Sequence, residues 1–245
     1  MTEEEMLKLP KKVAIVYSDV KREYFLTEDE YISEEGADIY ANDVAKYINK
    51  LGIEAVCLPC DNDIAKNLKQ HKPSMVLNLV DSVRGQSSLG VSIIGLLEIM
   101  HIPYTGAGNL GWSLGTNKFV MYQLMKASGI PVPNHQLMTG PNDMIDHDLR
   151  YPLFPKLNIE HSSIGIDETN ICEDEKQLRY KVRELMDKFK QPVLVDEFVA
   201  GIEVTSSVLE GANTKVYSVQ RKTARETKED VMTFDKKWKN WDNIR

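Results

Sequence analysis

Short apolar runs alternate with stretches of helical spacing over residues 13–104, and this alternation restricts the fold more than any other feature of the chain. Residues 13–17, 53–58 and 75–80 are typical of buried parallel strands, and residues 102–104 add a shorter fourth run. Apolar residues recur at helical spacing in between, at residues 40–51, 63–70 and 90–100. This β-α-β-α-β-α-β order predicts an α/β fold with a parallel sheet and right-handed crossovers.

The remaining stretches carry weaker patterns. Residues 20–36 are highly charged without a clear period, so they are interpreted as a long loop. Residues 106–115 contain four glycines and are expected to turn the chain away from the sheet, ahead of a helix at 118–128. Residues 134–150 are interpreted as a connector with an Asp-rich loop. Residues 211–245 are rich in alternating charges and are interpreted as a surface loop and tail.

A binding site is indicated within residues 151–203. Lys156 ends a short apolar run and precedes a polar turn at residues 161–165, His-Ser-Ser-Ile-Gly. A helix at 177–190 and a strand at 193–195 should follow, and acidic residues stand at the end of that strand. A cation, backbone N–H groups of a small-residue loop and carboxylates together suit a nucleotide, with its phosphates and ribose hydroxyls.

These motifs resemble those of the ATP-grasp enzymes, within them the D-alanine–D-alanine ligase-like branch. The matching segments in this half are Phe154-Pro155-Lys156, Ser162-Ser163-Ile164-Gly165, Val195-Asp196-Glu197-Phe198 and Gly201-Ile202-Glu203. The matching upstream segments are Gly95-Leu96-Leu97-Glu98, Ile102-Pro103-Tyr104-Thr105-Gly106, Asn117-Lys118 and Gly129-Ile130-Pro131-Val132-Pro133. The resemblance implies an N-terminal parallel-sheet (pre-ATP-grasp) domain at 1–112, a helical connector at 113–148 and an α+β ATP-grasp nucleotide-binding subdomain at 149–245.

The resemblance also implies which residues contact the nucleotide. Lys118 and Lys156 would neutralise its phosphates as point charges, aided by the loop residues Ser162, Ser163 and Gly165. Without the resemblance, a lysine that extends to the surface is the better interpretation of Lys156. Pro155 cannot donate a ladder hydrogen bond, so this strand is expected to be an edge strand or irregular.

The acidic strand would bind the adenosine part. Adjacent acids on a strand point to opposite faces, and the resemblance makes Asp196 the one that faces the adenine amino group. The backbone of Glu197, Phe198 and Val199 would contact the adenine edge, and Glu203 would accept hydrogen bonds from the ribose. A solvated hinge with surface acids is the alternative.

Two further residues are candidates for the chemistry. Asp235-x-Lys237-Trp238 resembles a mobile loop that closes over the γ-phosphate, which makes Lys237 a catalytic candidate. Arg84 follows the third predicted strand, at the edge where ligands bind in open α/β sheets, and is suited to bind a carboxylate bidentately. A solvated loop arginine is the alternative. Ser18-Asp19 replaces the Gly-Gly pattern with which D-alanine–D-alanine ligases bind their first substrate, so substrate identity does not transfer.

Two segments match known functional motifs letter by letter but are interpreted as structural. Residues 106–111 match G-x-G-x-x-G, but no helix is expected to open directly on them and no acid stands about 20 residues downstream. Cys57-Leu58-Pro59-Cys60 matches C-x-x-C, but no helix opens at its first cysteine to lower a thiol pKa. Both are interpreted without a dinucleotide, redox or zinc role.

Composition narrows the class of protein. The formal charge of −7 over 245 residues disfavours a nucleic-acid-binding surface. No apolar run approaches the ~20 residues of a membrane helix, and residues 1–10 lack a signal-peptide core. Three cysteines provide no disulfide framework. We therefore expect a cytoplasmic protein that binds neither nucleic acid nor membranes.

The resemblance implies an ATP-dependent carboxylate–amine ligase that forms an acyl phosphate, with ATP and Mg²⁺ and with amino acid or peptide-like substrates. In this branch the magnesium ligands come from a segment beyond residue 245, so no metal ligand is assigned within the chain. A non-catalytic ATP-grasp-like nucleotide-binding or regulatory protein is the first alternative. The second is an interaction module that a partner or a second copy completes as a homodimer.

Overall fold

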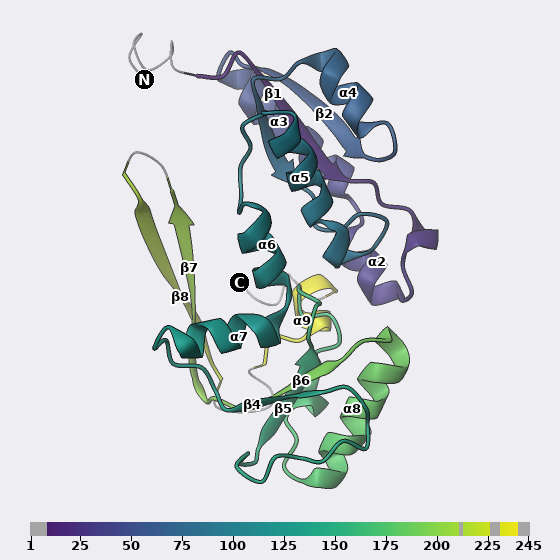
Figure 1. Ribbon diagram of the computed structural model, residues 1–245, viewed down its shortest axis with the longest axis vertical. Helices are drawn as coiled ribbons and strands as arrows, with labels where there is room; N and C mark the ends of the chain where they lie inside the picture. Colours follow the sequence, from purple (N-terminus) through teal and green to yellow (C-terminus); the bar gives the residue numbers. More distant parts are fainter. Residues whose placement is uncertain (1–8, 211–212, 226–230, 240–245) are drawn as a thin grey trace. The chain divides into compact units, whose positions relative to one another are not determined.

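The computed structural model describes residues 9–210, 213–225 and 231–239 (Figure 1). Within the strands, the side chains of residues 202–203 and 219–225 lie outside this description. The chain divides into two compact units, Met1–Met121 and Tyr122–Arg245. The first unit has a parallel sheet and the second has antiparallel sheets.

The sheet of the first unit has the strand order β2-β1-β3. Its strands are β1 (Lys12–Ser18), β2 (Glu54–Cys60) and β3 (Met75–Leu79), and both outer strands run parallel to β1. The fourth apolar run contributes a single parallel bridge, between Tyr104 and Val76. Pro103, which precedes Tyr104, has no N–H group to extend the pairing. The predicted α/β fold with a parallel sheet is confirmed.

Helices α3 (Ala37–Lys50), α4 (Ile64–His71) and α5 (Val91–Ile99) cover this sheet (Figure 1). Successive side chains of a strand point to opposite faces. Ile15 accordingly packs with Ala41 and Ala45 of α3, whereas Ala14 and Val16 pack in a second cluster with the buried residues of α4 and α5. The sheet therefore lies between α3 on one face and α4 with α5 on the other.

The interpretation of residues 20–36 as a loop was wrong in part. The segment contains a short 3-10 helix, Arg22–Tyr24, and helix α2 (Glu28–Glu34). Thr27 and Glu30 form a capping box at the start of α2, with the Thr27 hydroxyl accepting the Glu30 N–H at 3.2 Å and the Glu30 carboxylate accepting the Thr27 N–H at 2.7 Å. This reciprocal pairing satisfies two N–H groups that a helix end leaves unpaired, so charged residues that show no apolar period still form a helix.

The glycine-containing stretch after the sheet is also helical. Helix α6 (Asn109–Thr116) begins inside the G-x-G-x-x-G match, with Gly108 at its N-cap, so the expectation that no helix opens there was wrong. Close packing explains one nearby glycine, because a Cβ atom on Gly90 would lie 2.8 Å from the Trp112 ring of α6. Helix α7 (Lys118–Ala127) follows where the sequence predicts it and crosses from the first unit into the second.

The second unit contains an antiparallel sheet of order β4-β6-β5. Its strands are β4 (His135–Met138), β5 (Leu153–Leu157) and β6 (Val193–Glu197). Among the described residues, β5 has only β6 as a strand neighbour, so the expectation of an edge or irregular strand at Pro155 is confirmed. Strand β4 lies in the predicted connector at 134–150, which is therefore not wholly irregular. Its four residues pair with β6, and that tertiary partner is absent from the local sequence.

Helix α8 (Glu175–Phe189) packs against this sheet through one apolar stripe, as its spacing predicts. The buried members of the stripe are Leu178, Val182, Leu185 and Phe189. Lys181 lies on the same side and is only 2% exposed. A fully buried lysine requires a charged partner, which is identified below.

The last part of the chain is more regular than predicted. Strands β7 (Gly201–Leu209) and β8 (Lys215–Arg225) form an antiparallel hairpin, and helix α9 (Phe234–Trp238) follows. The interpretation of residues 211–245 as a surface loop and tail was therefore wrong for β8 and α9, because the β8 sequence Lys-Val-Tyr-Ser-Val has strand propensity that its charged neighbours obscured. Among the described residues, no helix has the length and apolarity that crossing a membrane requires.

Candidate functional site

Lys156 and Asp196 meet on one face of the β4-β6-β5 sheet. Lys156 of β5 is in register with Leu194, and Asp196 of β6 with Phe154, so the two side chains are diagonal neighbours. The Lys156 ammonium forms an ion pair with Asp196 Oδ2. Lys156 Nζ also donates to the Tyr122 hydroxyl at 2.9 Å, and that hydroxyl donates to Asp196 Oδ2 at 3.3 Å.

This pair is shielded from solvent. The side chains of Lys156 and Asp196 are 19% and 6% exposed. Burial is the largest single effect on the pKa of Lys156 and lowers it. The opposing effects of Asp196 and then Tyr122 together outweigh burial and raise this pKa above its ordinary value. Lys156 is therefore a protonated cation at neutral pH. The other oxygen of Asp196, Oδ1, is buried and has no hydrogen-bond partner among the described residues, so it remains an available acceptor.

The loop at residues 161–165, called the serine loop below, follows β5 in a strained turn. The carbonyl of His161 accepts the N–H of Ile164 at 3.1 Å across Ser162 and Ser163. These two serines have φ of 58° and 62°, a region that costs a side chain about 1–3 kcal/mol and persists only when surrounding structure enforces it. Gly165 has φ of 73°. Successive left-handed residues orient their N–H groups alike, as an anion-binding loop requires.

Helix α9 holds the serine loop from outside. The indole N–H of Trp238 donates to the Ser162 carbonyl at 3.0 Å, and the Phe234 N–H donates to the Ile166 carbonyl at 2.9 Å. Lys237 lies on the same helix, with its ammonium 5.5 Å from the centre of the Trp238 ring. The structure thus brings the Lys237 segment to the loop that carries Ser162 and Ser163.

The end of β6 separates its two acids as the sequence predicts. Asp196 faces Lys156, whereas Glu197 accepts the Arg150 N–H at 2.9 Å and the Asn134 amide at 3.2 Å. Phe198 donates its N–H to the Pro152 carbonyl at 2.9 Å, and the side chain of Val199 is 63% exposed. Glu203 lies in β7, and its side chain is outside the described part of the chain.

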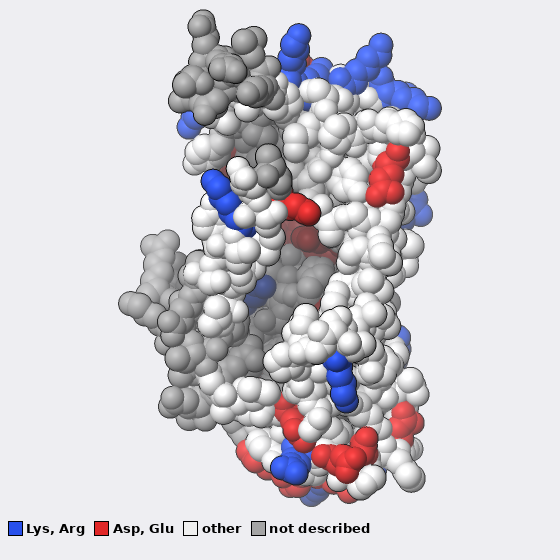
Figure 2. Space-filling model, turned by 60° about the vertical axis from the view of Figure 1, so that its left-hand side comes forward, with Lys and Arg blue, Asp and Glu red and all other residues white. Residues whose placement is uncertain are grey.

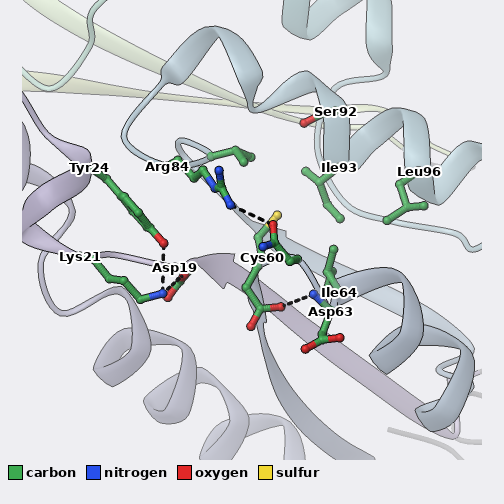
Figure 3. Close-up of a pocket in the computed structure, with 13 residues that line it drawn as sticks. Asp19, Lys21, Tyr24, Cys60, Asp63, Ile64, Arg84, Ser92, Ile93 and Leu96 are labelled. Atoms are coloured by element: carbon green, nitrogen blue, oxygen red, sulfur yellow. Dashed lines mark hydrogen bonds and ion pairs between the residues drawn. The ribbon is translucent and has the colours of Figure 1, made fainter.

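Arg84 and Lys118 belong to the first unit. Lys118 is the first residue of α7. Arg84 stands with Gly85 at the tip of a turn, with φ of 52° and 70°, closed by hydrogen bonds between Val83 and Gln86. Its guanidinium borders a cavity of about 430 Å³ and donates to Asn62 at 3.1 Å (Figure 3). Gly85 cannot carry a side chain, because its Cβ atom would lie 2.4 Å from the Tyr24 carbonyl.

The lining of this cavity also includes acidic and aliphatic side chains. Asp61 and Asp63 line it together with Ile64, Ile93 and Leu96, and Asp63, Ile64, Ile93 and Leu96 are labelled with Arg84 in Figure 3. Lys21 is engaged by Asp19 at 2.8 Å and by the Tyr24 hydroxyl at 3.1 Å. Arg84 forms its one hydrogen bond among described residues with Asn62, so most of its guanidinium N–H groups are available to a ligand.

The two cysteines of the C-x-x-C match belong to the sheet of the first unit. Cys57 and Cys60 both lie within β2. Burial raises the pKa of both thiols, that of Cys60 to about 11, with Asp61 and Asp19 contributing. Thiols that stay protonated at neutral pH are poor nucleophiles and poor metal ligands. In the view of Figure 2, several Lys and Arg side chains gather at the upper end, in the first unit, and a group of mainly Asp and Glu side chains lies at the lower end, in the second.

Sequence reasoning missed Tyr122 as a site residue. Its spacing indicates an apolar position of a helix, yet its hydroxyl contacts both members of the Lys156–Asp196 pair. Trp238 was noted within the Asp235-x-Lys237-Trp238 resemblance, but its bond to the serine loop was not predicted. No local pattern identifies these contacts, since the partners are 34, 74 and 76 residues away.

The sequence of this chain is similar to a known protein family and to several known proteins. Residues 124–245 match the family model "D-ala D-ala ligase C-terminus". A D-alanine--D-alanine ligase of Carboxydothermus hydrogenoformans is 34% identical over 175 residues, which are 68% of this chain and 54% of that relative. An uncharacterized protein, y4sG, of Sinorhizobium fredii is 26% identical over 206 residues, 81% of this chain and 60% of that relative. The chain therefore spans little more than half the length of these relatives.

Solved structures resemble the chain over a larger share of its length. A D-alanine--D-alanine ligase from Bacillus anthracis complexed with ATP has a TM-score of 0.62 at 17% identity and covers 85% of this chain and 70% of its own. The VanG D-Ala:D-Ser ligase from Enterococcus faecalis has a TM-score of 0.60 at 20% identity, with 85% and 68% covered. At such identities the likeness concerns the fold.

Proposed function

Because this chain is an ATP-grasp protein of the D-alanine–D-alanine ligase-like family, we propose that it acts in an ATP-dependent carboxylate–amine ligase. In this reaction a carboxylate attacks the γ-phosphate of ATP to form an acyl phosphate, and an amine then displaces phosphate. The observation that supports the proposal most directly is the buried, protonated Lys156 beside Asp196, followed along the chain by a loop that carries two left-handed serines.

The described residues fit a nucleotide. Lys156 is a desolvated cation whose partner Asp196 and whose hydrogen bond with Tyr122 fix its ammonium in place. The N–H groups of Ser162 and Ser163 would bind phosphate oxygens, and Lys118 would add a second cation. The unpartnered Oδ1 of Asp196 would accept a hydrogen from the adenine amino group, because a buried acceptor without a donor is unfavourable.

The hinge would complete the adenosine contacts. The N–H groups of Glu197 and Phe198 already donate to Asn134 and Pro152, which leaves their carbonyls and the Val199 backbone to contact the adenine edge. Glu203 is proposed to bind the ribose. Lys237, held on α9 beside the serine loop, is proposed to approach the terminal phosphate.

Magnesium would neutralise charge on the nucleotide phosphates when bound. None of the residues assigned above is one of its ligands. The contribution of the chain itself would be positioning and charge neutralisation, which supply most of the catalysis in phosphoryl transfer.

Arg84 is proposed to bind the carboxylate of an amino acid or peptide-like substrate. Its turn follows the C-terminal end of β3, the side on which open α/β sheets bind ligands, and among the described residues its guanidinium donates one hydrogen bond, to Asn62. A carboxylate would pair with the remaining donors in bidentate fashion. Asp61 and Asp63, which line the same cavity, would favour an amine on the same substrate.

Calorimetric titration of ATP and Mg²⁺ into the chain tests the nucleotide site. The parent should bind saturably, and Lys156→Met, which keeps the buried stem but removes the charge, should weaken binding at least about tenfold. Lys176→Met on the exposed side of α8 is the matched control and should bind as the parent does. No binding by the parent, or equal binding by Lys156→Met, would refute the assignment.

A further inference from the structure

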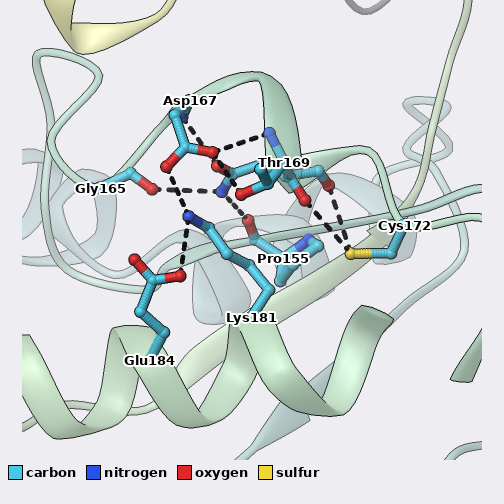
Figure 4. Close-up of polar contacts among 8 residues, drawn as sticks. Pro155, Gly165, Asp167, Thr169, Cys172, Lys181 and Glu184 are labelled. Atoms are coloured by element: carbon cyan, nitrogen blue, oxygen red, sulfur yellow. Dashed lines mark hydrogen bonds and ion pairs between the residues drawn. The ribbon is translucent and has the colours of Figure 1, made fainter. Parts of the chain in front are cut away.

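A single buried amide joins the two segments to which phosphate contacts are assigned above. Asn170 is 0% exposed and ends a short 3-10 helix, Glu168–Asn170. Its Nδ2 donates to the Pro155 carbonyl at 2.7 Å and to the Gly165 carbonyl at 3.2 Å (Figure 4). Pro155 directly precedes Lys156, and Gly165 closes the serine loop. One side chain therefore links the lysine strand to the serine loop.

Asn170 is in turn anchored to helix α8 through a buried charge. Its Oδ1 accepts the Asp167 N–H at 2.8 Å. The Asp167 carboxylate accepts the Thr169 N–H at 2.7 Å and the Lys181 ammonium at 2.7 Å (Figure 4). Lys181 is the buried lysine of α8, and it also contacts Glu184 at 3.3 Å. This chain of bonds accounts for a buried charge that the nucleotide site does not use.

The open edge of β5 explains why an amide is required at this point. No strand in the described part of the chain lies beyond β5 to pair with the Pro155 carbonyl, and a buried carbonyl without a donor is unfavourable. A leucine or methionine would fill the same space but would leave the carbonyls of Pro155 and Gly165 unpaired. Asn170 satisfies both carbonyls at once, and its geometry sets the distance between the two segments.

The serine loop depends on such external bonds. Its left-handed serines are held against their backbone preference, and groups that bind a ligand together must stay within about 0.5 Å of their productive positions. Loss of the Asn170 bonds would let the Gly165 end of the loop move away from Lys156. A ligand that contacts both segments would then bind more weakly, because part of the free energy of binding would be needed to restore the loop.

We infer that Asn170 is a positioning residue for phosphate binding, with the Asp167–Lys181 pair as its anchor on α8. This inference rests on the nucleotide site proposed above. Asn170 itself touches no phosphate in this account. Its effect passes through Pro155 to Lys156 and through Gly165 to the serines.

Calorimetric titration of ATP and Mg²⁺ into Asn170→Asp tests the inference. This isosteric variant exchanges a donor for an acceptor next to two carbonyls, so Kd should rise about tenfold relative to the parent. Titrations are made well below the unfolding midpoint of each variant. Asn170→Ser, which is too short to reach both carbonyls, serves if Asn170→Asp does not fold. Val182→Ala removes a fully buried α8 side chain outside the network and should lower the unfolding midpoint with Kd unchanged.

The outcomes separate this inference from the proposed function. A folded Asn170 variant with the Kd of the parent would refute the positioning role and leave the nucleotide site standing. Equal weakening in Val182→Ala would also refute it, since lost stability alone would then explain the result. Absence of binding by the parent would overturn the nucleotide site and the positioning role together.

Discussion

Gly165→Ala tests how tightly the serine loop is packed onto the core. An added Cβ atom would lie 2.9 Å from Leu185, 3.2 Å from Leu157 and 3.3 Å from Phe189, and all three distances are shorter than an ordinary van der Waals contact. These three side chains are 2%, 1% and 3% exposed, so they have little room to move aside. Gly165 also has φ of 73°, a region that L side chains rarely adopt.

The expected loss of stability in Gly165→Ala has two contributions. A left-handed backbone costs a side chain about 1–2 kcal/mol, and overpacking of a filled core costs about 1–3 kcal/mol. The stiffer unfolded chain offsets roughly 0.4–1 kcal/mol. Gly165→Ala should therefore lower the free energy of unfolding by about 3 kcal/mol, as measured by urea denaturation followed by circular dichroism.

Gly129→Ala is the matched control for this measurement. Gly129 lies in the same unit with φ of 74°, and no atom of the described residues stands within 4 Å of its added Cβ atom. Gly129→Ala should therefore lower the free energy of unfolding by about 1 kcal/mol, the cost of the left-handed backbone alone. If both variants lose the same stability, the packing argument for Gly165 is refuted.

Two further predictions concern titratable groups. Burial raises the pKa of Cys60 to about 11, so the folded protein should alkylate at neutral pH far more slowly at this thiol than the urea-unfolded chain; equal rates would contradict its burial. Burial would raise the pKa of Asp167, but hydrogen bonds from Lys181 and Thr169 lower it below its ordinary value of 3.8. The stability that this carboxylate contributes should be complete above 3.8 and lost as pH falls through the lowered folded value. Lys181→Met should reduce this acid dependence of the urea midpoint, and an unchanged dependence would argue against the Asp167–Lys181 pair.

Local patterns were sufficient for much of the fold. The apolar runs at β1, β2 and β3 predicted a parallel sheet, and the stripe on α8 predicted the side that packs. Pro155 predicted an edge strand from the chemistry of one residue. These predictions succeeded because strand burial and helix amphipathicity repeat at short, regular spacings.

Other elements were missed because their stabilising partners lie elsewhere. Helix α2 depends on the Thr27–Glu30 capping box and a buried bond from Ser82 to Glu34 at 2.8 Å, and neither adds an apolar period. Strand β4 has four residues and exists by pairing with β6. Strand β8 pairs with β7 across the hairpin, and its charges obscured its strand propensity.

The sequence by itself determined the α/β order and the family resemblance. It also determined which residue types lie close to Lys156 along the chain. The order and spacing of residues are enough to establish all three features. The tertiary structure decided which side chains meet: Asp196 and Tyr122 at Lys156, Trp238 at the serine loop, and Asn170 between the two segments. These contacts join residues from 5 to 76 positions apart, and hydrogen-bond geometry in a packed interior is set by the positions of whole elements. No short-range periodicity encodes it.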